Sequence, residues 1–165
     1  MNPRRGQPVS ALLAQVSPEK LSVLLADNAD EPHAQLLAAS LAGRTFPTTD
    51  TLAKAIRTAL THLGRETQEL SIRRTFQALR IAVNDEFSAL DTLLRLLPGC
   101  LNPGGRVAFL TFHSGEDRRV KKAFEAGRRE GSYQEISSEV RRPSAEERHA
   151  NPRSASAKLR WARRA

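Results

Sequence analysis

The first part of the chain has apolar residues at spacings of three and four, which is typical of amphipathic helices. Three short helices are predicted on this basis, over residues 17–28, 30–43 and 48–64. Ser17 followed by Pro18 favours a helix start, because serine caps a helix and proline fits its first turn. Gly43 and Gly64 favour helix ends. Residues 1–8 are rich in residues that break helices, so we expect an irregular arm there.

A longer amphipathic helix is predicted over residues 71–97, with a cap at Ser71 and an end at Pro98 and Gly99. Its apolar residues would form one buried face: Ile72, Phe76, Leu79, Val83, Phe87, Leu90, Leu94 and Leu97. Polar residues of the same period would lie on the opposite face: Arg73, Gln77, Arg80, Asn84, Ser88, Asp91 and Arg95. Such a stripe is more common on a solvated face than on a binding face, and both interpretations stay open.

After residue 105 the pattern changes to that of an α/β protein. Residues 106–112 form a nearly continuous apolar run, which predicts a central parallel strand covered on both faces. Ser114 and Asp117 resemble a capping box for a helix that reaches about residue 126. Two more strands are predicted, over residues 133–140 and 157–163. With so few strands beside it, the apolar strand keeps one open edge, and such an edge favours pairing with another chain.

Charge is distributed unevenly along the chain. The net charge is +8, and residues 105–165 hold 15 basic and 8 acidic side chains. This surplus suggests a polyanionic partner such as a nucleic acid, although basic faces are also commonly just solvated. No apolar run is long enough to span a bilayer and the first residues do not form a secretory signal, so we expect a cytoplasmic protein with no membrane partner.

Cysteine and histidine do not indicate a metal site. Cys100 is the only cysteine, so it has no internal disulfide partner. The four histidines have no spacing that places two of them on one helix face. We therefore predict no metal.

Three sequence blocks stand out in the second part of the chain: RTFQALRIAVNDE at 74–86, NPGGRVAFLTFHSGEDR at 102–118 and NPRSASAKLR at 151–160. In this order they resemble the bacterial small-subunit (16S) rRNA cytosine-N4 methyltransferases. The resemblance is clear from about residue 70 onward and weaker before it. It covers only the carboxyl-terminal part of that family.

The resemblance implies an S-adenosylmethionine-dependent enzyme that methylates a cytosine in the ribosomal decoding region. It implies an α/β fold, with a partial Rossmann-like methyltransferase sheet of about three strands and an α-helical insertion subdomain. We accordingly predict the helical insertion over residues 1–70. Residues 71–165 would be the carboxyl-terminal part of the methyltransferase domain.

The candidate catalytic residues follow the apolar strand, because ligands of such sheets bind at the carboxyl ends of the strands. They are His113, Ser114, Glu116 and Asp117. A capping box with a histidine in the turn explains Ser114 and Asp117 equally well. Basic and amide side chains are the candidate RNA-binding residues: Arg73, Gln77, Arg80, Asn84, Arg118, Arg153, Lys158 and Arg160.

The chain also departs from the family. It contains no Gly-x-Gly-x-Gly motif for the methyl donor, and Gly104-Gly105 enters a strand instead of leaving one. No residue of this chain is therefore predicted to bind S-adenosylmethionine, and we expect catalysis to need a separate amino-terminal donor-binding half. Gly115 stands where the family usually has a bulkier apolar residue, and residues 69–72 replace its usual His-Pro segment.

Two other functions remain open at this point. A non-catalytic RNA-binding relative, or a decayed fragment, would keep the basic residues and lack the chemistry. A small helical DNA-binding protein with a basic tail would fit the charge, but it fits the predicted strands at 106–112 and 157–163 poorly. Both binding functions predict an affinity for nucleic acid that falls steeply with salt.

Overall fold

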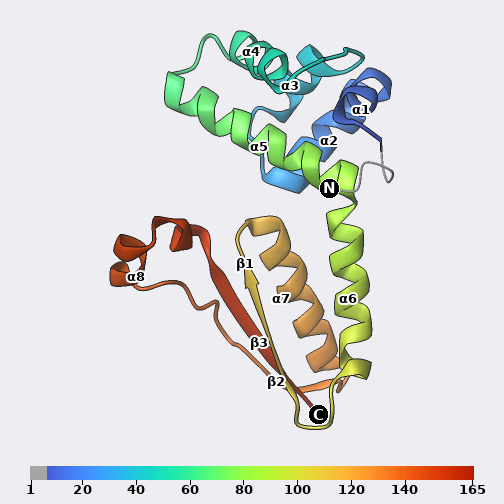
Figure 1. Cartoon of the computed structure of the whole chain (residues 1–165). Helices are drawn as coiled ribbons and strands as arrows, with labels where there is room; N and C mark the ends of the chain where they lie inside the picture. Colours follow the sequence, from blue (N-terminus) through green and yellow to red (C-terminus); the bar gives the residue numbers. More distant parts are fainter. Residues whose placement is uncertain (1–6) are drawn as a thin grey trace. The chain divides into compact units, whose positions relative to one another are not determined.

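The computed structural model describes residues 7–165, which divide into two compact units (Figure 1). The first unit ends at Glu86 and the second comprises Phe87–Ala165. Of the irregular arm expected over residues 1–8, residues 1–6 lie outside the described part, and Gln7 and Pro8 have no regular structure. Within residues 7–165, no helix is long and apolar enough to cross a membrane.

The first unit is helical and contains α1 (Val9–Gln15), α2 (Pro18–Ala29), α3 (Ala34–Leu41), α4 (Thr49–Ala59) and α5 (Arg65–Asn84). Its core is formed by fully buried side chains such as Leu25, Leu37 and Ile56, against which Leu79 of α5 packs. The three predicted short helices are confirmed as α2, α3 and α4. Ser17 caps α2 by accepting a hydrogen bond from the backbone N–H of Lys20 at 3.4 Å.

The prediction of one long helix over residues 71–97 is wrong at both ends and in the middle. Helix α5 begins earlier, at Arg65, and Ser71 is no cap because it is buried and donates to Glu31 Oε1 at 2.9 Å. Asp85 then ends α5 in the left-handed conformation, with φ of 52°. A second helix, α6 (Glu86–Cys100), contains Pro98 inside its last turn.

A local polar cluster accounts for the break. Arg80 donates to both carboxylate oxygens of Glu86, at 3.0 and 3.1 Å, and Asn84 donates to Oε1 at 3.0 Å. Aspartate tolerates the left-handed conformation better than most residues, and a carboxylate at Glu86 is favourable in the first turn of α6. The compact units divide here, while the predicted limits of the helical insertion, residues 1–70, stay a prediction.

The second unit continues from α6 with β1 (Arg106–Thr111), α7 (Ser114–Arg129), β2 (Tyr133–Ile136), α8 (Ala145–Ala150), a 3-10 turn (Pro152–Ser156) and β3 (Lys158–Arg164). Its core lies between the sheet and the helices, where Leu94, Val120 and Phe124 pack against Tyr133 and Ala162. The predicted α/β class, with a sheet of three strands and a helical part, is confirmed.

The position of the apolar strand in the sheet was predicted wrongly. The strand order is β1-β3-β2 and both pairings are antiparallel, so β3 is central and β1 lies at an edge. An apolar run indicates that a strand is buried. It does not indicate which strands lie beside it or in which direction they run. The predicted edge strand over 133–140 is present but shorter. β2 ends at Ile136, after which Ser137 N–H donates to Trp161 O at 2.8 Å and Arg141 forms an isolated bridge with Leu159.

Candidate functional site

The turn from β1 into α7 carries the four candidate catalytic residues. β1 ends at Thr111, which is buried and whose hydroxyl donates to the backbone oxygen of Lys158 at 3.3 Å. This contact with β3 fixes the end of the strand. Phe112 follows with 51% of its surface exposed, and α7 begins at Ser114. The turn therefore stands at the carboxyl end of β1.

His113 is the cap of α7. Its backbone is extended, with φ of −137°, and its Nδ1 accepts a hydrogen bond from the N–H of Glu116 at 3.4 Å. The capping box that we predicted for Ser114 and Asp117 is thus displaced by one residue. The reason is that a neutral imidazole nitrogen can accept the hydrogen bond that a hydroxyl usually accepts, which places Ser114 in the first helical turn.

The Glu116 carboxylate reaches back over this turn. Its Oε2 accepts the N–H of Phe112 at 3.1 Å, and its Oε1 lies 3.2 Å from His113 Nε2. Within the described residues that nitrogen is buried and has no well-aligned hydrogen bond. The His113 imidazole lowers the pKa of Glu116 most, the Phe112 N–H adds to this, and burial opposes it. The lowered pKa keeps the Glu116 carboxylate ionised and makes it a weaker base than an ordinary glutamate.

Asp117 and Arg160 form an ion pair between α7 and β3. Arg160 Nε donates to Oδ1 at 2.7 Å and Nη2 donates to Oδ2 at 3.1 Å. The side chains are only 14% and 11% exposed. The structure thus brings together one predicted catalytic residue and one predicted RNA-binding residue. Their two-fold contact is the strong geometry for an arginine and a carboxylate, and it anchors the first turn of α7 on the sheet.

Phe87 and Arg119 support the turn from the other side, a role that was not predicted from the sequence. The Phe87 ring centroid lies 5.8 Å from that of His113, and the Arg119 guanidinium lies 4.0 Å above the Phe87 ring. Arg119 also donates to Asp91 Oδ2 at 3.3 Å. A Cβ atom on Gly115 would lie only 2.6 Å from Phe87 Cζ. The unusual glycine at position 115 was the one signal of this close approach.

The polar stripe of α5 has its own contacts inside the first unit. Arg73, Arg80 and Asn84 are exposed, as the helical period predicted. Arg80 and Asn84 are both engaged by Glu86, whereas Gln77 is half-buried and donates to the backbone oxygen of Asn28 at 3.5 Å. Exposed cations on one helix face are compatible with phosphate contacts. Their role in RNA binding stays a prediction.

The remaining candidate RNA-binding residues belong to the second unit. Arg118 is exposed on the first turns of α7, Arg153 is exposed on the 3-10 turn, and Lys158 is half-buried at the start of β3. Arg160 differs from Arg118 and Arg153 in exposure, because it is largely buried in its ion pair with Asp117.

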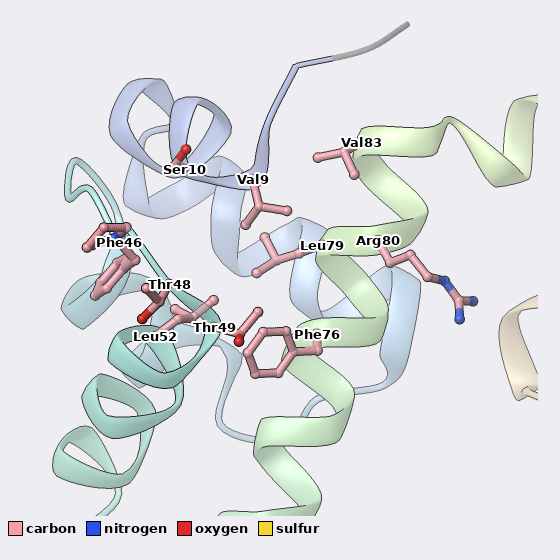
Figure 2. Close-up of a pocket in the computed structure, with 11 residues that line it drawn as sticks. Val9, Ser10, Phe46, Thr48, Thr49, Leu52, Phe76, Leu79, Arg80 and Val83 are labelled. Carbon is pink, nitrogen blue, oxygen red and sulfur yellow. The ribbon is translucent and has the colours of Figure 1, made fainter. Parts of the chain in front are cut away.

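A groove of about 360 Å³ lies on the first unit, between the start of α4 and the face of α5 (Figure 2). Phe46, Leu52 and Phe76 are among its apolar lining residues. Arg80 is the only candidate RNA-binding residue on its wall, and Figure 2 shows the Arg80 side chain directed away from the apolar side chains. The groove is thus a gap in apolar packing with one cation at its rim.

The described residues do not fit S-adenosylmethionine. Gly104 and Gly105 form the turn that leads into β1, where Gly104 N–H donates to Arg164 O at 3.2 Å, so no glycine-rich loop leads from a strand into a helix. At the other end of the strand, the first turn of α7 is occupied by its own His113 and Glu116. In residues 7–165, no group of three or more His, Cys, Asp or Glu side chains could hold a metal ion.

Comparison with known proteins relates the whole chain to one family. The sequence model of the MraW methylase family matches residues 1–165. The chain is 45% identical over 171 residues to the ribosomal RNA small subunit methyltransferase H 2 of Alkaliphilus metalliredigens, covering 98% of this chain and 49% of that protein. It is 44% identical over 174 residues to the ribosomal RNA small subunit methyltransferase H 1 of Agathobacter rectalis, covering 100% and 50%.

A shorter stretch is more similar still to another relative. Over 94 residues, 55% of this chain, it is 57% identical to the ribosomal RNA small subunit methyltransferase H of Synechococcus sp. strain WH7803, of which it covers 29%. The chain spans about half the length of the Alkaliphilus and Agathobacter relatives.

Proposed function

The chain belongs to the MraW methylase family, and from this premise we propose that it is the carboxyl-terminal part of a small-subunit rRNA methyltransferase. The enzyme would transfer a methyl group from S-adenosylmethionine to the N4 amino group of a cytosine, acting in the cytoplasm where ribosomal subunits are made. The observation that carries the proposal is the family match over all 165 residues.

The His113 and Glu116 pair is the part of this chain that we assign to the reacting base. The amino nitrogen of cytosine must lose a proton when it is methylated. Glu116 is the carboxylate beside the exposed Phe112, so we assign it to accept that proton from its position; its lowered pKa keeps it ionised and makes it a weak base. Asp117 is held by Arg160 and would position the turn instead of reacting. Ser114, in the first turn of α7, would line the same site.

The methyl donor would be bound by the half of the relatives that this chain does not match. The support for this is the lack of a fitting site in residues 7–165 together with the half-length coverage of relatives such as the Alkaliphilus protein. The chain alone is then inactive. The RNA would be held by the exposed basic residues, among them Arg73, Arg118 and Arg153.

A non-catalytic RNA-binding relative is the second candidate. The observation in its favour is that His113, Glu116 and Asp117 are all engaged by partners inside this chain, which a purely structural turn also explains. This candidate predicts RNA binding without methyl transfer under any condition.

Methyl incorporation into small-subunit RNA separates the two candidates. The chain would be assayed with a labelled methyl donor, first alone and then together with a polypeptide carrying the unmatched half of the Alkaliphilus relative. We expect transfer only in the mixture, and its loss in Glu116→Gln but not in Glu139→Gln, an exposed glutamate after β2. Transfer by the chain alone would refute the need for a donor-binding half. Salt-dependent RNA binding with no transfer in the mixture would establish the binding protein.

A further inference from the structure

A hollow of about 520 Å³ lies between α6 and α7, which run side by side in the second unit (Figure 1). Its volume falls within the roughly 300–1,000 Å³ that is usual for ligand sites. Residues that recur at the helical period and share one face of α6 form one wall: Asp91, Leu94, Arg95 and Pro98. Residues of α7, from Arg119 onward, form the facing wall. None of its lining residues is a candidate catalytic or RNA-binding residue, and we call it the α6/α7 hollow.

Tyr133 lines the α6/α7 hollow and carries an unsatisfied hydroxyl. The residue is 2% exposed, and its hydroxyl has no hydrogen-bond partner within residues 7–165. Its ring is held in place, because its centroid lies 5.4 Å from that of Phe124 and a Cβ atom on Gly127 would lie 2.6 Å from Tyr133 Cδ2. Buried polar groups nearly always have a partner. A hydroxyl held without one in the wall of a hollow therefore indicates a ligand atom there.

Arg119 carries a second buried donor without a partner in the same wall. Its Nη1 donates to Asp91 Oδ2 at 3.3 Å, and its guanidinium lies 4.0 Å above the Phe87 ring. These two contacts hold the guanidinium, while its Nε–H is buried and unpartnered in the described part of the chain. A guanidinium only donates hydrogen bonds. The group that would satisfy Arg119 is therefore an acceptor, such as an oxygen atom of an anion.

Arg95 and Lys122 add positive charge one helical turn further along. Arg95 comes four residues after Asp91 on α6, and Lys122 comes three residues after Arg119 on α7. Both side chains are exposed, and neither belongs to an ion pair of residues 7–165. Asp91, the carboxylate of this part of the hollow, is already engaged by Arg119. The potential here therefore favours an anion.

The other end of the α6/α7 hollow has a different chemistry. Glu130 caps the end of α7, and Ser132 and Tyr133 follow it. Glu130 is exposed and opposes a second anionic group, while it can accept a hydrogen bond from an amino group. Leu94 and Ala123 lie between the two ends. The order along the hollow is thus cations, an apolar wall and uncharged or acidic hydrogen-bonding groups.

We propose that the α6/α7 hollow binds one unpaired nucleotide of an RNA, with its phosphate at Arg95, Arg119 and Lys122 and its base toward Tyr133. A nucleotide has the required order of groups: an anionic phosphate, a ribose, and a base with amino and carbonyl groups. The base must be unpaired, because side chains read base edges in loops and single strands and not inside an RNA helix. This contact goes beyond the proposed function, since it holds the RNA at a place other than the reacting base.

The carboxylate at the far end argues for a nucleotide over an acidic peptide. A peptide with several carboxylates would bring one of them against Glu130, and like charges oppose such an approach. A base amino group would instead donate to Glu130. The charge of the second unit agrees with an RNA partner, because residues 105–165 hold 15 basic and 8 acidic side chains.

Tyr133 allows a direct test because it is the only tyrosine of the chain. The full chain would be labelled with 3-fluorotyrosine and titrated with a short single-stranded RNA. We expect its single fluorine resonance to shift until binding saturates. The same strand annealed into a duplex, inorganic phosphate and polyglutamate should each shift the resonance less than a tenth as much at the same concentration of charged groups.

Two neighbouring lysines of α7 provide a matched control. Lys122→Gln removes a charge from the α6/α7 hollow, and it should weaken binding of the single-stranded RNA at least fivefold. It should also lower the slope of log affinity against log salt concentration by about 0.7. Lys121→Gln removes the same charge from a lysine outside the hollow that pairs with Glu125 at 3.7 Å, and it should leave the affinity within twofold. Fluorescence anisotropy measures both.

Tyr133→Phe removes only the hydroxyl group. It should weaken binding of the single-stranded RNA at least threefold, because the base loses a hydrogen bond. It should not lower the melting temperature, because the hydroxyl has no partner to lose within the folded chain. A hydroxyl with a purely structural role would give the opposite pair of results.

Four results would overturn this proposal: no fluorine shift with single-stranded RNA, an equal shift with the duplex, phosphate or polyglutamate, equal effects of the two lysine substitutions, or a Tyr133→Phe variant that melts lower and binds RNA as the parent does. The proposed function fails separately. RNA binding in the hollow with no methyl transfer under any condition leaves this site and removes the activity. Methyl transfer by the mixture, with Lys122→Gln and Tyr133→Phe binding RNA as the parent does, removes the site and leaves the activity.

Discussion

Arg160 on β3 holds Asp117 on α7 through two hydrogen bonds, of 2.7 and 3.1 Å, in a place where both side chains are largely buried. The pair connects the central strand to the first turn of the helix. That same turn carries His113 and Glu116, so the geometry of the proposed proton acceptor depends on the ion pair. Positioning by a buried pair that takes no part in the chemistry is a common way to fix a site.

Breaking this pair should destabilise the second unit. Asp117→Asn leaves the Arg160 charge buried without its counter-charge, and removing one partner of a buried pair typically costs about 3 kcal/mol or more. Urea denaturation followed by circular dichroism measures the free energy of unfolding. The control is Asp91→Asn, since the Asp91 and Arg119 pair is more exposed and such pairs contribute less than about 1 kcal/mol. Similar losses in both variants would contradict the structural role of Arg160.

The close approach of Phe87 to Gly115 predicts a specific intolerance. Gly115→Ala would place a Cβ atom 2.6 Å from Phe87 Cζ, and the ring has little freedom because it contacts His113 and Arg119. Overpacking of this kind costs about 1–3 kcal/mol. Thermal melts should show the loss, and adding Phe87→Leu should recover part of it.

Gly99→Ala is the matched control for that substitution. Gly99 lies in α6 with nothing within 4 Å of an added Cβ. Alanine there should raise stability by up to about 1 kcal/mol, because glycine is the poorer helix former. If Gly115→Ala behaved in the same way, the packing of Phe87 on the turn would be refuted.

The helical positions of the first unit could be predicted because each depends on neighbours in the sequence. Ser17 caps α2 from three residues away, and the buried face of Ile72 and Leu79 follows the helical period. Ser71 looked like a cap for the same local reason. In the folded chain it is buried and donates to Glu31, forty residues earlier. A contact between residues so far apart in the sequence produces no periodic pattern.

The turn from β1 into α7 and the sheet show the same limit of prediction from the sequence. A strand at 106–111 could be predicted from its apolar residues, but the placement of β1 at an edge is decided by its pairing with β3, some fifty residues later. The residues of the candidate site were found because they follow a strand. Their partners were not, since Arg160 and Phe87 come to the turn from distant elements.

The lowered pKa of Glu116 predicts a pH dependence of stability. Its ordinary value is 4.5 and its value in the folded chain is lower. The stabilisation is therefore fully present above about pH 4.5 and is lost as the pH falls through the lower folded value. In Glu116→Gln the melting temperature should fall less steeply with acidification below pH 4.5 than in the parent. Glu139→Gln, which removes an exposed carboxylate, is the control, and an identical change of slope in both would contradict the contact with His113.

RNA binding should depend on exposed arginines, so the affinity should fall as the salt concentration rises. Arg153 is exposed on the 3-10 turn of the basic second unit, so Arg153→Ala should remove a phosphate contact. Each such contact contributes about 0.7–0.9 to the slope of log affinity against log salt concentration. Fluorescence anisotropy with a small-subunit rRNA fragment, repeated at several salt concentrations, measures this slope. Arg44→Ala is the control, because Arg44 donates to Ser40 O at 2.9 Å and lies over the Phe46 ring. An unchanged slope for Arg153→Ala, or an equal change for both variants, would exclude Arg153 from the RNA contact.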